Sequence, residues 1–74
     1  MNREEFLEKM KDLMQTEEDI TCETVLENIL EWDSLAKMST LAFLDNDFGV
    51  KLTFNDFSEI KTIEDIAKKA GILW

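Results

Sequence analysis

Apolar residues recur near the start of the chain with the period of an α-helix. Between residues 3 and 14 they fall at relative positions i, i+1, i+4, i+7 and i+8, which share one face of a helix. These residues are Phe6, Leu7, Met10, Leu13 and Met14. Asn2 and Glu5 have the spacing of a reciprocal helix cap. The pattern predicts a helix from about residue 3 to residue 14, with one side packed into a core.

A second helix is predicted over residues 34–48, and it is apolar on two opposite sides. The bulkier side holds Thr40, Leu41, Phe43, Leu44 and Phe48. So small a domain cannot surround a helix completely, so one of the two sides must stay partly exposed. We assign the side with the larger residues to the core. Leu35, Met38 and Ala42 lie on the other side and are expected to form an exposed apolar strip.

Two capping pairs mark two further elements towards the end of the chain. Thr53 with Asp56 predicts a short helical turn over residues 54–59, and Thr62 with Asp65 predicts the start of another helix. The apolar stripe of that last helix is Ile63, Ile66, Ala67 and Ala70. Gly71 is well placed to end it.

Residues 15–33 form a long loop, which in a compact domain needs a function or packing of its own. We expect its apolar side chains to fix it to the core, with a short helical turn around residues 25–30. These side chains are Ile20, Val25, Leu26, Ile29, Leu30 and Trp32. Together the elements predict one all-α domain over residues 1–74, a small up-down helical bundle of three longer helices and one short helix.

The charge balance excludes several classes of partner. The 74 residues carry a net charge of −9, and residues 1–33 hold eleven acids and three bases. Nucleic acids and anionic membranes are bound through Lys and Arg, so neither is expected as a partner. The acidic third is either a solvated loop or a docking surface for basic partners. No stretch has the length of a membrane span or the pattern of a signal peptide, so we expect a cytoplasmic protein. We also expect a monomer.

The chain lacks side chains that catalysis and metal binding commonly need. Histidine is absent and Cys22 is the sole cysteine, so neither a Ser-His-Asp triad nor a His-containing zinc site can form. Residues 45–56 superficially resemble a calcium loop, but Gly49 falls at position 5 instead of 6 and a ligand is missing. We therefore expect a protein that is not an enzyme, holds no metal and serves as a substrate of enzymes.

The two ends of the second helix carry a family resemblance. Asp-Ser-Leu opens it at residues 33–35 and Phe-Gly-Val closes it at residues 48–50. With these motifs the chain resembles the acyl carrier protein family over residues 32–70. The resemblance implies that Ser34 is esterified to 4′-phosphopantetheine taken from coenzyme A. The thiol of that cofactor would then hold an acyl group as a thioester.

The resemblance also implies roles for the neighbours of Ser34. Asp33 would cap the helix and present the serine, and Leu35 and Met38 would flank the exit of the arm. Leu35, Met38 and Ala42 would contact a phosphopantetheinyl transferase and the acyl-loading and acyl-transfer enzymes. An acyl chain would shelter between the helices, in a lining formed by Phe43, Leu44, Ile60 and Ile66.

Two departures from the family pattern bear on the pathway. The fatty-acid carriers place several acids along this helix, whereas residues 36–40 here read Ala-Lys-Met-Ser-Thr. Trp32 stands where a glycine often precedes the Asp-Ser pair. These departures favour a specialised pathway. The alternatives are a housekeeping fatty-acid carrier and an unmodified acidic helical adaptor, which would not need the Ser34 hydroxyl.

Overall fold

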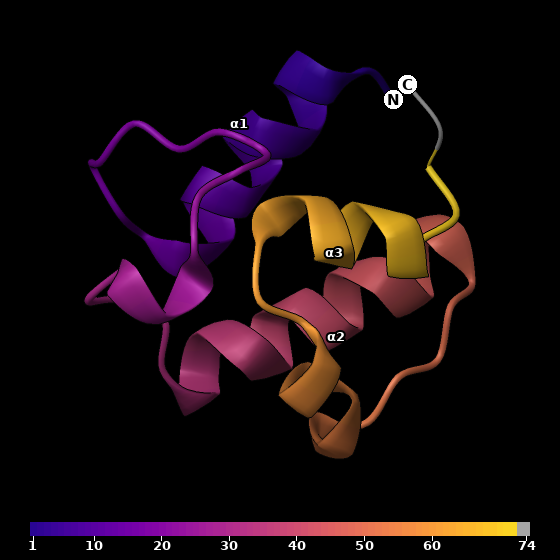
Figure 1. Cartoon of the computed structure of the whole chain (residues 1–74). Helices are drawn as coiled ribbons and strands as arrows, with labels where there is room; N and C mark the ends of the chain where they lie inside the picture. Colours follow the sequence, from indigo (N-terminus) through magenta and orange to yellow (C-terminus); the bar gives the residue numbers. More distant parts are fainter. Residues whose placement is uncertain (73–74) are drawn as a thin grey trace.

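The computed structural model describes residues 1–72, which form three α-helices and two short 3₁₀ helices (Figure 1). The α-helices are α1 (Arg3–Met14), α2 (Ser34–Phe48) and α3 (Ile63–Lys69). The 3₁₀ helices are η1 (Leu26–Asn28) and η2 (Phe54–Glu59). The predicted all-α bundle of three longer helices and one short helix is therefore confirmed, and η1 is the turn expected within the long loop.

In Figure 1, α1 and α2 run in opposite directions and are joined by the long loop. α3 follows η2 and runs in about the same direction as α2. Buried apolar side chains from the long loop and from all five helical segments meet in one core. The most deeply buried of them are Phe6, Met10, Leu26, Leu44, Ile63 and Ile66.

The starts of the helices are set by the capping residues that the sequence suggested. The Asn2 side chain accepts a hydrogen bond from the Glu5 backbone N–H (2.8 Å), and Glu5 accepts one from Asn2 in return (3.1 Å). At α3, Asp65 accepts hydrogen bonds from the backbone N–H groups of Lys61 (2.9 Å) and Thr62 (3.2 Å). These bonds satisfy backbone donors that would otherwise lack partners at the helix start.

The hydrogen bonds from the backbone N–H groups of Lys61 and Thr62 hold the pKa of the Asp65 carboxyl below its ordinary value, and the bond from Lys61 has the larger effect. The pKa is thus lower in the folded protein than in the unfolded chain. The cap therefore stabilises the fold fully at neutral pH, and this stabilisation is lost as the pH falls through the lowered pKa.

Glycines in the left-handed region end two of the helices. Gly49 follows α2 with φ of +67°, and Gly71 lies just beyond α3 with φ of +79°. Beyond α3, the backbone N–H of Ile72 donates to the carbonyl of Ala67 (3.0 Å) and that of Gly71 to the carbonyl of Lys68 (3.1 Å). This is the Schellman arrangement, in which glycine adopts a positive φ without steric strain.

The long loop between α1 and α2 is fixed to the core, although not by all of the residues expected. Ile20, Leu26 and Ile29 are buried, whereas Val25 is partly exposed and Leu30 is 91% exposed. Leu26 and Ile29 are three residues apart and share a side in the 3₁₀ turn η1, so the adjacent Leu30 faces water. The expectation that every apolar loop residue packs inwards was therefore wrong for Val25 and Leu30.

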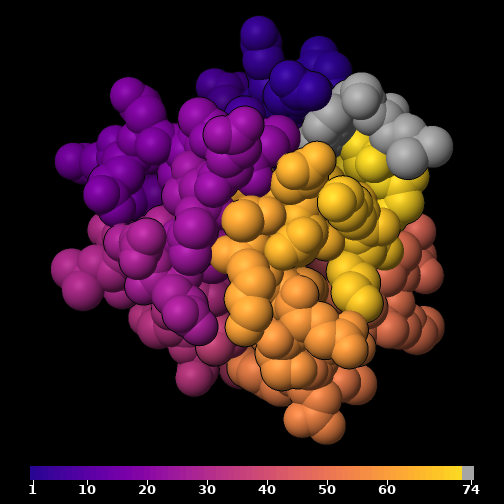
Figure 2. All heavy atoms as spheres, in the orientation of Figure 1, coloured from indigo at the N-terminus to yellow at the C-terminus, as the bar shows by residue number. Residues whose placement is uncertain are grey.

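Backbone hydrogen bonds hold the loop against the segment that leads into α3. The N–H of Leu26 donates to the carbonyl of Lys61 (2.9 Å), and the N–H of Glu64 donates to the carbonyl of Cys22 (2.9 Å). Figure 2 shows the loop, in purple to magenta, lying directly against this orange segment. The middle of the loop is thus held by a part of the chain far away in sequence.

We expect the melting temperature to rise with ionic strength. In the ion pairs of Lys11 with Asp19 (3.5 Å) and of Lys51 with Asp45 (3.6 Å), the side chains of Asp19 and Lys51 are largely exposed. No base lies between Lys11 and Lys37. The loop acids repel one another over about 10 Å at 0.1 M salt, and over longer distances in dilute buffer. Thermal melts followed by circular dichroism should therefore shift upwards with NaCl, and further with millimolar Mg²⁺. A melting temperature that stays constant from low to moderate salt would contradict this account.

Candidate functional site

Ser34 is the first residue of α2, and its side chain is exposed. Asp33 precedes it in an extended conformation and accepts a hydrogen bond from the backbone N–H of Ala36 (2.9 Å). Asp33 is therefore the N-cap that the sequence predicted. The cap fixes the first turn of α2 and leaves the Ser34 hydroxyl at a helix end that carries partial positive charge.

Trp32 supports the segment that leads into Ser34. Its ring makes an edge-on contact with the ring of Phe57 in η2, with centroids 5.5 Å apart and planes at 79°. Its backbone N–H donates to the carbonyl of Ile29 (3.1 Å). The sequence marked Trp32 as a departure from the family pattern, but only the structure shows that it links the Ser34 segment to η2.

The apolar residues near Ser34 on α2 divide between two sides, as predicted. Leu35 is 71% exposed and Met38 is 57% exposed, and Ala42 is also exposed. On the other side, Thr40, Phe43 and Leu44 are buried and Leu41 and Phe48 are half-buried. Leu35, Met38 and Ala42 are called the apolar strip below.

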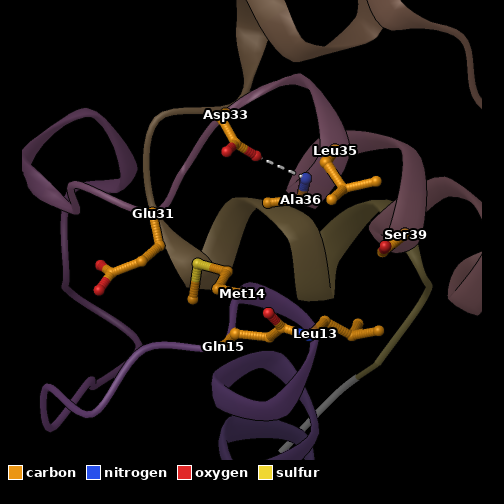
Figure 3. Close-up of a pocket in the computed structure, with 8 residues that line it drawn as sticks. All are labelled: Leu13, Met14, Gln15, Glu31, Asp33, Leu35, Ala36 and Ser39. Carbon is orange, nitrogen blue, oxygen red and sulfur yellow. Dashed lines mark hydrogen bonds between the residues drawn. The ribbon is translucent and has the colours of Figure 1, made fainter.

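A pocket of about 410 Å³ lies next to Ser34, between the end of α1 and the start of α2 (Figure 3). Its lining combines apolar side chains with polar ones. The lining residues are Leu13, Met14, Gln15, Glu31, Asp33, Leu35, Ala36 and Ser39. Asp33 and Leu35, the two neighbours of Ser34, both belong to it.

The sequence did not single out this pocket as a site. The lining expected for an acyl chain was Phe43, Leu44, Ile60 and Ile66, and all four are buried in the core and line no part of this pocket. Of the lining residues, only Asp33 and Leu35 were predicted as site residues. The other six were missed, because the pocket arises from the way that the end of α1 meets the start of α2. Only the i, i+4 spacing of Leu35 and Ser39 hinted that these two share a face of α2.

One carboxylate oxygen that borders the pocket lacks a hydrogen-bond partner in the described part of the chain. The Oε1 atom of Glu31 is buried and has no hydrogen-bond partner among residues 1–72. In Figure 3 the Glu31 carboxyl group points away from Leu35 and Ser39. Glu31 therefore borders the pocket without directing its charge at the groups on α2.

Neither a metal site nor a membrane span emerges from the described part of the chain. Within residues 1–72, no group of three or more His, Cys, Asp or Glu side chains is arranged to hold a metal ion. No helix of that part combines the length and the apolar character needed to cross a membrane.

Comparison with known proteins places the chain in a family. The family model described as a phosphopantetheine attachment site matches residues 4–69. An acyl carrier protein from Coprothermobacter proteolyticus is 30% identical in an alignment of 71 positions. The alignment covers 89% of this chain and 87% of the relative. No solved structure gave a significant match.

These matches cover both ends of α2 and the capped segment around Ser34. The cofactor of such a domain is 4′-phosphopantetheine, and its role is that of a carrier, not of an enzyme. The chain therefore belongs to the acyl carrier protein family of phosphopantetheine-attachment domains.

Proposed function

We propose that Ser34 is the attachment point of 4′-phosphopantetheine and that the protein presents acyl thioesters to the enzymes of a specialised biosynthetic pathway. The observation that carries this proposal is the exposed Ser34 hydroxyl at the capped start of α2. When bound, the cofactor supplies a thiol on a long flexible arm. The protein positions the arm and provides the surface that enzymes recognise.

The environment of each serine supports the choice of Ser34. Ser39 is half-buried on α2, and the Ser58 hydroxyl donates a hydrogen bond to the carbonyl of Asn55 within η2 (2.8 Å). Ser34 combines exposure with a helix N-terminus, where a phosphodiester anion is favoured by the helix dipole. The residues at the start of α2 therefore fit the cofactor.

Intact-mass analysis tests this function directly. The protein is incubated with coenzyme A, Mg²⁺ and a phosphopantetheinyl transferase of broad specificity. The expected result is a mass increase of one phosphopantetheine per chain. No increase with several such transferases would favour the unmodified acidic adaptor.

The residues along α2 support a specialised pathway over housekeeping fatty-acid synthesis. The acids of α2 are Asp45 and Asp47, at the end of the helix far from Ser34, and Asp45 pairs with Lys51. The first two turns after Ser34 hold no acid and include Lys37. A partner that recognises several acids near the serine would meet few of them here.

The same proposal includes the setting in which the carrier works. We take residues 1–74 to be a single monomeric carrier domain that acts in the cytoplasm. The free cysteine Cys22 suits a reducing compartment. The proposed partners are a phosphopantetheinyl transferase and the enzymes that load and transfer the acyl group.

We expect Met38→Glu to weaken recognition by these enzymes without unfolding the protein. Met38 lies in the middle of the apolar strip, and a charge there would have to be desolvated in a complex. The kcat/KM of the transferase should fall about tenfold, equivalent to ~1.4 kcal/mol. Asn46→Glu is the matched control, because it adds the same charge at an exposed position of α2 farther from Ser34. Equal kcat/KM values for the two variants would mean that the apolar strip is not part of the docking surface.

A further inference from the structure

We propose that the pocket between the end of α1 and the start of α2 is an intramolecular binding site for the pantetheine part of the arm. This inference rests on the proposed attachment at Ser34. It adds a resting position for the arm, in which the arm folds back from Ser34 over the first turns of α2 towards α1.

The position of the pocket makes it directly accessible to the arm. Asp33 and Leu35 line it from either side of Ser34, so the arm leaves the protein at the edge of the pocket. Leu35 and Ser39 are one helical turn apart, so this part of the lining extends along α2 away from Ser34. Figure 3 shows Leu13 and Met14, at the end of α1, and Gln15, just beyond it, across the pocket from Leu35, Ala36 and Ser39 of α2.

The lining matches the chemistry of pantetheine, which has two methyl groups on one carbon, a hydroxyl group and two amides. Leu13, Met14 and Ala36 offer apolar surface, whereas Gln15 and Ser39 offer donors and acceptors. Among residues 1–72, no hydrogen bond engages the side chain of Gln15 or of Ser39, so both are available to the arm amides. The volume of about 410 Å³ lies within the ~300–1,000 Å³ typical of small-molecule sites.

The charge of the lining favours the neutral part of the arm over an anion. The charged residues of the pocket, Glu31 and Asp33, are both acidic. A free phosphate or a fatty-acid carboxylate would be repelled, whereas pantetheine carries no charge. The phosphodiester would remain outside the pocket, beside Ser34 at the N-terminus of α2.

The apolar strip gives this site a means of release. Leu35 belongs both to the strip and to the lining of the pocket. An enzyme that docks on the strip would contact the edge of the occupied pocket and compete for Leu35. Docking would then favour the extended arm that the enzyme needs.

Nuclear magnetic resonance of the ¹⁵N,¹³C-labelled protein before and after modification tests the inference. Intact mass first establishes whether the arm is attached. In the modified protein, the amide resonances of Gln15 and Ser39 should shift. Nuclear Overhauser contacts should join the pantetheine methyl groups to the side chains of Leu13 and Met14.

Ser39→Phe fills the pocket and should abolish these contacts while the arm is still attached. Ser58→Phe is the matched control, since it makes the same change on η2, outside the pocket, and should leave the contacts intact. Circular dichroism verifies that both variants fold.

Each other outcome counts against the inference. If no mass is added to the wild-type protein, the proposed function fails and the inference fails with it. If the mass is added but shifts are confined to the immediate neighbours of Ser34, or appear around Phe57 and Ile60 instead, the inference alone is overturned. Contacts that persist in Ser39→Phe would also overturn it, and if this variant is unfolded, the wild-type contacts to Leu13 and Met14 decide.

Discussion

Replacing Ser34 with alanine is expected to abolish phosphopantetheine attachment completely, because no other hydroxyl combines its exposure with its position at the capped start of α2. The added mass seen with the wild-type protein should be absent from Ser34→Ala even after prolonged incubation. The fold should survive, since substitutions at exposed positions usually change stability by less than about 0.5 kcal/mol. Intact mass and circular dichroism measure the two effects separately.

Ser39→Ala and Ser58→Ala are the controls for this result, because each removes a different serine hydroxyl of the same chain. Both variants should be modified to completion. Attachment to folded Ser34→Ala would contradict the assignment of Ser34, and loss of attachment in Ser39→Ala or Ser58→Ala would point to that residue instead.

Replacing Leu44 with alanine should produce the largest loss of stability. Leu44 is fully buried among the core residues of α1, α2 and α3. Emptying such a site costs about 2–5 kcal/mol, and a core of this size rarely supplies more than about 3–5 kcal/mol of net stability. A large share of the Leu44→Ala protein should therefore be unfolded at room temperature. Urea denaturation followed by circular dichroism gives the free energy of unfolding.

Leu35→Ala provides the matched comparison, because it is the same substitution on the same helix at a position that is 71% exposed. Its free energy of unfolding should remain close to that of the wild-type protein. Similar losses for the two variants, or a larger loss for Leu35→Ala, would mean that the two sides of α2 are assigned wrongly.

The sequence predicted the helices well because their ends depend on local interactions. Two of the helices begin with a reciprocal cap, formed by Asn2 with Glu5 and by Thr62 with Asp65. The partners of each cap are three positions apart, so the spacing in the sequence identifies them. Gly49 likewise meets the need for a positive φ at the end of α2. The two sides of α2 followed from the 3.6-residue period together with the size of the side chains.

The features that the sequence could not predict depend on contacts between distant segments. Whether Leu26 or Leu30 faces the core depends on η1 and on the hydrogen bond from Leu26 to Lys61. The contact between Trp32 and Phe57 depends on where η2 lies. The pocket next to Ser34 depends on how the last turn of α1 meets α2, which no periodic pattern records.

Phe48 illustrates the limit of a pattern within a single helix. Its angular position on α2 places it with Phe43, and the two rings do meet edge-on, with centroids 5.5 Å apart. Phe48 is nevertheless half-buried, because it is the last residue of α2, where less of the chain covers it. The apolar pattern shows which side of a helix a residue lies on, but not how much its position along the helix reduces its burial.

Tandem mass spectrometry of the protein isolated from its own cells tests the central claim most directly, because fragmentation releases the pantetheine arm together with any acyl group that it carries. The account predicts an arm localised to the peptide containing Ser34, with a released fragment that includes an acyl group bound through the thiol and labile to hydroxylamine. The mass of that group also distinguishes a specialised pathway from fatty-acid synthesis. A chain that is unmodified at Ser34, or that carries the arm on another residue, would contradict the account.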